Sequence, residues 1–188
     1  SIIHPTMWQA GTRTGRFSYS DPNLQNIPKE EHSVHDHVIR GCFKPRPGRR
    51  YVSFDFSQME YRMMAAYAGA TDIIIAVMNG ADFHQATATL IGITRSQAKT
   101  LNFALLYGAG VDKIASMLGC SKIQAEQIKF RYFSKLPKVE TFIDRVIKTG
   151  RPRGYVETWC NRRMYADKEF CSALPIHLIQ GGGADVVK

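Results

Sequence analysis

The clearest pattern of polar and apolar positions lies between residues 94 and 108. Thr94 followed by Gln97 is typical of a capping box, in which each side chain satisfies a backbone N–H at the start of a helix. Gly108 predicts the other end, because glycine tolerates the left-handed conformation that closes many helices. The sequence therefore predicts a helix over 94–108.

One face of this predicted helix carries an ordered row of side chains. Arg95, Lys99, Phe103 and Tyr107 recur at steps of four, so they line a slowly turning face about 18 Å long. The two cations lie near the N-terminus, where the helix dipole favours anions, and the two aromatic rings lie at the far end. This order suits a nucleoside triphosphate, although such stripes also occur on helices with solvated cations and a buried aromatic edge.

The N-terminal third has a different pattern. Residues 14–28 are polar and interrupted by proline, which indicates an ordered loop. Residues 49–57 alternate apolar and polar positions, which predicts a strand that carries Asp55 at its end. A helix is expected from Ser57 to about Ala68.

Helical patterns dominate the remainder. Asp82 opens the second of two short helices within 72–92, and a capping box at Ser121 and Gln124 opens a long helix. The further elements expected are a helix from Pro137 to about Thr149, a hairpin within 154–165 and a last helix that begins near Gln180. The fold class predicted is mixed α/β, mostly helical.

Composition says more about the possible binding partners of the chain than about its fold. The 188 residues are enough for one sizeable core, and the net charge of +9 points to a polyanionic partner. No apolar run approaches the ~20 residues that cross a membrane, and no secretory signal pattern is present. The four cysteines lack metal-type spacing, so reduced thiols and an intracellular location are expected.

Several motifs, in order along the chain, resemble those of family A DNA polymerases, the bacterial DNA polymerase I type. The string Arg95-x-x-x-Lys99-x-x-x-Phe103-x-x-x-Tyr107 is similar to the nucleotide-binding helix of that family. The strings that start at Thr14, Asp55 and Asp82, the hairpin at 154–165 and the Gln180 segment add further matches.

The resemblance implies a role for each matching residue at the nucleotide. Asp55 would bind both catalytic magnesium ions, and the backbone carbonyl of Phe56 would bind one of them. Lys99 would be catalytic and would hold the triphosphate. The other nucleotide-binding residues implied are Arg95, Phe103, Tyr107, His84, Gln58 and Glu60, of which Glu60 would crowd the 2′ position of the sugar. Taken alone, His84 has the pattern of a surface histidine.

The resemblance also implies contacts with DNA. Arg16 and Gln180 would read the minor groove, and Asn23 and Gln25 would hold the duplex backbone. Three positions depart from the family pattern: Glu30 and Ser172 stand where an arginine is usual, and Ile176 where an asparagine is usual.

As a family A segment, the chain would divide into residues 1–70 of a partial palm, 71–150 of the fingers, and 151–188 with the hairpin and the return to the palm. The function implied is template-directed transfer of a nucleotide from a dNTP to a primer 3′-hydroxyl, with primer–template DNA as partner. The family's second metal-binding carboxylate lies in a His-Asp-Glu motif that does not occur among the 188 residues. We therefore expect the segment to be inactive alone and to work with the thumb and the rest of the palm.

Two alternatives remain at this point. A single-subunit RNA polymerase relative would share the Arg95/Lys99/Tyr107 helix, but Glu60 argues against an enzyme that must admit a 2′-hydroxyl. A DNA-binding fragment without catalysis is the other, and the presence of Asp55 together with Lys99 argues against it.

Overall fold

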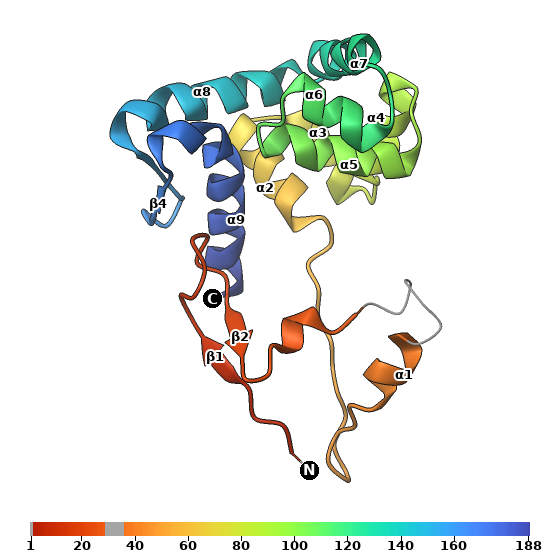
Figure 1. The fold of residues 1–188 in the computed structure, drawn as a ribbon, viewed down its shortest axis with the longest axis vertical. Coiled ribbons are helices and arrows are strands. Elements are labelled where there is room, and N and C mark those ends of the chain that lie inside the picture. Colours follow the sequence, from red (N-terminus) through yellow and green to blue (C-terminus); the bar gives the residue numbers. More distant parts are fainter. Residues whose placement is uncertain (1, 29–35) are drawn as a thin grey trace. The chain divides into compact units, whose positions relative to one another are not determined.

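The structure, a computed structural model, describes residues 2–28 and 36–188, and it forms two units, Ser1–Ser57 and Gln58–Lys188 (Figure 1). Glu30, one of the three departures from the family pattern, lies outside the described residues. The described part of the chain contains no helix that is both long and apolar enough to cross a membrane.

The Ser1–Ser57 unit contains a short hairpin that the sequence did not predict. Strands β1 (Thr6–Trp8) and β2 (Ser18–Ser20) pair antiparallel, with Met7 opposite Tyr19. The indole of Trp8 donates to the Ser20 hydroxyl at 3.1 Å. A 3₁₀ turn, η1 (Leu24–Asn26), and helix α1 (Asp36–Gly41) follow. Three-residue strands carry too little period-two pattern to stand out in a sequence.

The strand predicted at 49–57 is wrong. Residues 51–56 adopt no regular secondary structure, and the side chains of Tyr51, Val52 and Phe54 are exposed. An alternating pattern produces a strand only where a neighbouring strand accepts its backbone hydrogen bonds. None of the strands in the described residues pairs with this stretch.

The Gln58–Lys188 unit is mostly helical, as predicted. Its helices are α2 (Met59–Ala68), α3 (Thr71–Met78), α4 (Phe83–Ile91), α5 (Arg95–Leu106), α6 (Val111–Leu118), α7 (Lys122–Lys135), α8 (Pro137–Arg153) and α9 (Leu174–Val187). The other elements are the hairpin of β3 (Tyr155–Glu157) and β4 (Arg163–Tyr165) and the 3₁₀ segment η2 (Lys168–Ala173). Helix α5 packs against α4 and α6, while α2 packs against α3, α8 and α9 (Figure 1). Helix α2, which the sequence grouped with residues 1–70, thus packs within this unit.

Local signals in the sequence mark the starts of α4, α5, α7 and α8. The Thr94–Gln97 capping box is present in both directions at α5, and the Ser121–Gln124 box is present at α7. Asp82 caps α4 through its side chain, as predicted. Helix α8 starts at Pro137 and continues to Arg153, four residues beyond the predicted end.

Helix α9 begins at Leu174, six residues before the predicted start at Gln180, and its three glycines lie inside the helix. A Cβ on Gly181 would lie 2.8 Å from the Met164 sulfur, and one on Gly182 would lie 2.5 Å from the Met63 methyl. The glycines therefore allow α9 to approach β4 and α2 closely, which compensates for their low helix propensity. Ile176, another departure from the family pattern, is fully buried here.

The backbone of Ser172 lies unusually close to Gly108, just beyond the end of α5. Gly108 adopts a φ of 72°, and a Cβ there would lie 2.6 Å from the Ser172 Cβ and 2.7 Å from the Ser172 carbonyl oxygen. Gly119, at the end of α6, adopts a similar φ of 64° but has open space around it. A substitution at Gly119 would therefore cause backbone strain alone, whereas one at Gly108 would cause both strain and a steric clash.

We predict that Gly108→Ala lowers the free energy of unfolding of the 188-residue chain by about 3 kcal/mol, because it combines left-handed strain with overlap against the Ser172 backbone. Gly119→Ala, the matched control, is expected to lose only about 1 kcal/mol from strain. Urea unfolding followed by circular dichroism measures both. Equal losses would show that the approach of Ser172 does not constrain position 108.

Candidate functional site

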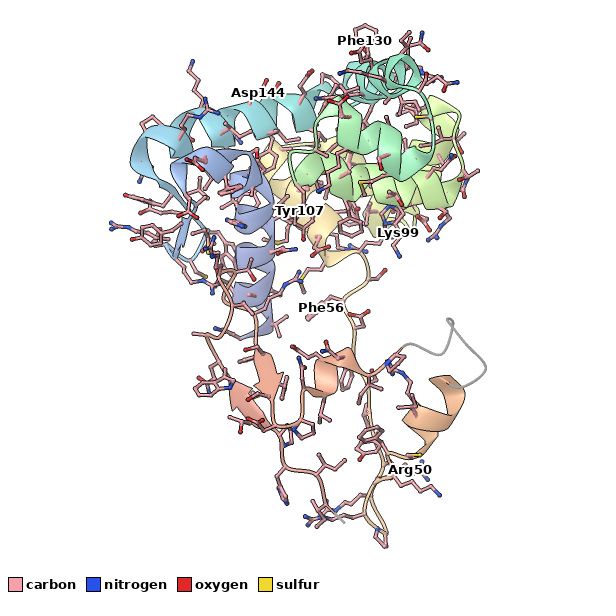
Figure 2. The ribbon with its side chains drawn as sticks, in the orientation of Figure 1. Arg50, Phe56, Lys99, Tyr107, Phe130 and Asp144 are labelled. Carbon is pink, nitrogen blue, oxygen red and sulfur yellow. The ribbon has the colours of Figure 1, made fainter. Side chains whose placement is uncertain are left out.

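Helix α5 presents the row that the sequence predicted. Arg95 and Lys99 are exposed, Phe103 is half-buried, and Tyr107 is 48% exposed. The opposite face is buried. Its buried residues are Ala98, Leu101, Asn102, Ala104, Leu105 and Leu106. Lys99 and Tyr107 are labelled along this edge of the unit in Figure 2. Packing of one face therefore leaves the cationic and aromatic row at the surface.

Arg95 is held by an acidic partner before any ligand binds. Its Nε and Nη2 donate to Oδ2 of Asp82 at 2.9 and 2.6 Å. The other oxygen of Asp82 accepts from the backbone N–H groups of His84 and Gln85 at 2.9 and 3.1 Å. Burial by itself raises the pKa of Asp82, but the Arg95 hydrogen bond and charge together with the two backbone donors leave it below its usual value.

His84 is buried, with 7% of its surface exposed, so the surface position expected from its local pattern is wrong. Its Nδ1 lies 3.1 Å from the side-chain nitrogen of Asn102, which also lies 3.3 Å from the Thr87 hydroxyl. Burial lowers the pKa of His84; the charge of Asp82 opposes that shift, and the charges of Arg95 and Lys99 add to it. The imidazole is therefore favoured in its neutral form.

Phe103 and His84 belong to one aromatic cluster centred on Tyr61. The Tyr61 ring stacks on Phe83 at 4.8 Å between centroids and meets His84 edge-on at 4.6 Å. It also meets Phe103 edge-on at 5.5 Å. Burial raises the pKa of Tyr61, so its hydroxyl stays protonated. The cluster restricts the orientation of Phe103 and His84 through packing.

Three predicted residues meet at the other end of the α5 row. The side-chain nitrogen of Gln180 donates to the Tyr107 hydroxyl at 2.8 Å and to Glu60 Oε1 at 3.4 Å. Gln180 thereby links α9 to the end of α5 and to the first turn of α2. The sequence assigned Gln180 to DNA and Glu60 to the sugar, and in the structure the Gln180 side chain contacts both Glu60 and Tyr107.

Gln58 connects the starts of two helices. It adopts a left-handed φ of 54° before α2, its side-chain oxygen accepts from the Phe83 N–H at 3.0 Å, and its amide nitrogen donates to the Ala81 carbonyl at 3.2 Å. A non-glycine residue in this conformation is held there by its surroundings. Gln58 thus positions the loop before α4, which carries Asp82.

The remaining predicted residues lie in the Ser1–Ser57 unit. Arg16 is exposed, Asn23 caps η1, and the Gln25 amide donates to the Phe17 carbonyl at 3.0 Å. Asp55 and Phe56 are exposed. A carboxylate and a backbone carbonyl are hard oxygen donors of the kind that Mg²⁺ prefers. The residues that the structure describes contain no group of three or more His, Cys, Asp and Glu side chains that could hold a metal ion, so Asp55 belongs to no such group.

The sequence predicted the row of residues on α5 but not the side chains that contact them and His84. Asp82 was identified as a helix start but not as the partner of Arg95, and Tyr61 was not identified at all. Asn102 was visible as a polar residue on the apolar face of the helix formed by Ala98, Leu101 and Leu105. A polar residue at such a position usually has a buried hydrogen-bond partner, which is the signal that could have found it.

Comparison with known proteins covers the whole chain. A family model described as DNA polymerase family A matches residues 1–188. The thermostable DNA polymerase I of Thermus aquaticus is 34% identical over 205 residues, an alignment that covers 99% of this chain and 24% of that relative. The DNA polymerase I of Chloroflexus aurantiacus is 35% identical over 208 residues, which cover 99% of this chain and 21% of that relative. The chain thus spans about a quarter of the length of these curated relatives.

A solved structure is similar as well. The POL domain of Pol1 from M. smegmatis, in complex with DNA primer-template and dNTP, has a TM-score of 0.86 and 28% identity. The similarity covers 98% of this chain and 36% of that one.

We predict that Asp82→Asn and Asp82→Ala separate the two roles of this carboxylate. Asparagine keeps a capping oxygen and loses only the exposed ion pair, a loss of at most about 1 kcal/mol in unfolding free energy. Alanine loses the cap too, which costs about 1 kcal/mol more. Urea unfolding of the 188-residue chain at neutral pH measures both.

The same variants also predict the direction in which the stability difference changes as the pH is lowered. The pKa of Asp82 is lower in the folded chain than its unfolded value of about 3.9, so its stabilisation is present above about pH 4 and is lost as the pH falls through the folded pKa. The stability difference between wild type and Asp82→Asn should therefore shrink on acidification. A difference that stays constant to pH 2 would contradict the ion-pair assignment.

Proposed function

The chain belongs to DNA polymerase family A, and we propose that it supplies the fingers and part of the palm of a DNA-directed DNA polymerase. The polymerase would transfer nucleotides from dNTPs to a primer 3′-hydroxyl on a DNA template. In this proposal residues 1–70 belong to the palm, 71–150 to the fingers, and 151–188 return to the palm. The observation that carries the proposal is the exposed α5 row, Arg95 to Tyr107, in a chain that matches the family from end to end.

The cationic end of α5 would bind the triphosphate. Arg95 and Lys99 are both exposed, and they lie on the first turns of the helix, where free backbone N–H groups add positive potential. Arg95 would exchange the carboxylate of Asp82 for phosphate oxygens, which keeps the guanidinium paired with an anion in both states. Neutralising and positioning the phosphates is the main task in phosphoryl transfer.

Lys99 would also act in the chemical step. The primer 3′-hydroxyl would lose its proton to water, and its oxygen would form a bond to the α-phosphorus while the bond from that phosphorus to the bridging oxygen of pyrophosphate breaks. A proton from the Lys99 ammonium group would neutralise the leaving pyrophosphate oxygen, which is general acid catalysis. This assignment makes Lys99 a catalytic residue and Arg95 a binding residue.

The aromatic end of α5 would receive the sugar and base. Phe103 is braced by Tyr61, and Tyr107 is held by Gln180, so both rings are positioned before binding. Glu60, reached by the same Gln180, would crowd the 2′ position of the sugar and exclude ribonucleotides. His84 would donate a hydrogen bond to a phosphate, and Gln58 would support the site from the start of α2.

Asp55 and the Phe56 carbonyl would hold magnesium, with the other ligands supplied by phosphates, water and further protein oxygens. Magnesium, when bound, neutralises charge on the phosphates and lowers the pKa of an attacking hydroxyl. Arg16, Asn23, Gln25 and Gln180 would contact primer–template DNA, whose phosphates the net charge of +9 favours. The enzyme would work inside the cell, where DNA is copied.

The two alternatives from the sequence are less well supported. The family match is to DNA polymerases, and Glu60 in the first turn of α2 is the carboxylate that an RNA polymerase would lack. A fragment that only binds DNA would have no need for an exposed Lys99 one turn beyond Arg95.

We predict that Lys99→Ala, in a polymerase that contains these 188 residues, lowers the single-turnover rate by about 100-fold or more while DNA affinity changes little. Rapid-quench measurement at saturating dNTP gives the rate. Lys113→Ala, on α6, removes an equivalent surface charge and serves as the control. A rate for Lys99→Ala within threefold of wild type would refute its role in the chemical step.

Glu60→Ala should raise the use of ribonucleotides relative to deoxynucleotides by about tenfold or more, because it removes the group that crowds the 2′-hydroxyl. The ratio of kcat/KM for ATP and dATP measures this change. If that ratio equals the wild-type value, Glu60 is not the sugar gate.

A further inference from the structure

A buried trio of polar side chains lies beneath the exposed α5 row. It consists of His84 and Thr87 on α4 and Asn102 on α5, and all three are buried, with Asn102 fully so. Asn102 lies on the same helix as Arg95 and Lys99, but on its buried face. None of the roles proposed so far uses Asn102 or Thr87.

The hydrogen bonds of Thr87 determine which end of the Asn102 amide faces the trio. The Thr87 hydroxyl donates its only hydrogen to the Phe83 carbonyl at 2.8 Å. Its oxygen can therefore only accept from Asn102, whose side-chain nitrogen lies 3.3 Å away. The amide NH₂ group thus points toward Thr87, and this orientation also brings it to 3.1 Å from Nδ1 of His84.

An NH₂ group at hydrogen-bond distance can be satisfied only if Nδ1 of His84 accepts. A neutral imidazole that accepts at Nδ1 carries its proton at Nε2. The geometry points to Asn102 as a positioning residue that fixes His84 in the Nε2–H tautomer, so that the ring offers a neutral donor to a phosphate of the incoming nucleotide. The tautomer follows from the trio alone, whereas the phosphate contact rests on the proposed function.

The charged and titratable groups around His84 also affect whether its ring is neutral or doubly protonated. Asp82, which caps α4, favours a protonated ring, while Arg95 and Lys99 on α5 oppose it. Tyr61 on α2 meets the ring edge-on and stays neutral because burial raises its pKa. A second proton on His84 would also place an N–H against the Asn102 NH₂, two donors facing each other. Asn102 therefore disfavours the imidazolium as well as the Nδ1–H tautomer.

Asn102→Asp reverses this constraint with almost no change in shape. A carboxylate accepts only, so it would draw the His84 proton to Nδ1 and leave Nε2 as an acceptor at alkaline pH. It would also raise the pKa of His84, because the imidazolium gains an adjacent anion. As the pH falls through that raised pKa, the imidazolium forms and the Nε2–H donor returns.

The first experiment reads the tautomer directly. The 188-residue chain, labelled with ¹⁵N-histidine, is studied at pH 8 by long-range ¹H–¹⁵N correlation spectra, with His84→Gln used to assign the signals. We expect Nε2 to carry the proton in the wild type and Nδ1 to carry it in Asn102→Asp. A wild-type ring protonated at Nδ1 would overturn the inference whatever the variant does.

The second experiment uses a polymerase that contains these residues. At pH 8.5, Asn102→Asp should raise KM for dATP about tenfold, the effect of one lost hydrogen bond to a charged group, with a smaller change in kcat. The ratio of KM values to wild type should fall toward one as the pH is lowered. Asn161→Asp, which makes the same substitution in an exposed turn, should show no pH-dependent ratio.

The two experiments separate the two ways of failing. The expected tautomers with a pH-independent KM ratio would keep the trio but overturn the role of His84 at the phosphate. An enzyme without dNTP incorporation would overturn the proposed function and leave the tautomer measurement standing. A general loss of packing in Asn102→Asp would lower kcat at every pH and would not recover on acidification, which also contradicts the inference.

Discussion

Burial of one face of α5 is the constraint on which the candidate site depends. Leu101 and Leu105 lie in the core of the Gln58–Lys188 unit, so the rotation of the helix about its axis is determined by packing. Once that rotation is set, Arg95, Lys99 and Tyr107 must lie at the surface, because they occupy the opposite positions of the 3.6-residue repeat. The capping box at Thr94 sets the start of the helix and hence the height of each side chain along it.

Polar contacts from other helices then hold each end of the exposed row. Asp82 pairs with Arg95 at the N-terminal end, and Gln180 reaches Tyr107 and Glu60 at the other end. Each contact joins α5 to another helix, and each restricts a side chain that would otherwise sample many rotamers. Restricting these residues before binding reduces the conformational entropy that a ligand must overcome. Gly108 follows Tyr107 directly, and the close approach of Ser172 leaves no room for a Cβ at position 108.

The sequence by itself determined the features that rest on local interactions or on several residues in a fixed order. The capping boxes at Thr94 and Ser121, the Asp82 cap and the hairpin at 154–165 all formed as predicted, because each depends on contacts within a few residues. The family could also be identified, since its motifs are short strings of defined residues that recur in order. The row on α5 was predictable for both reasons.

Only the tertiary structure decided the features that depend on neighbours far along the chain. The pattern at 49–57 predicted a strand, but a strand needs a pairing partner that the pattern does not encode. The three glycines of α9 have low helix propensity, so the local sequence argues against a helix interior there. They are needed because Met164 and Met63 lie too close to leave room for a Cβ at Gly181 and Gly182. His84 has a surface pattern, yet α4, α5 and α2 together bury it and Asn102 orients it. In each case the outcome depends on contacts with another element of the fold, and the local sequence does not determine which element that is.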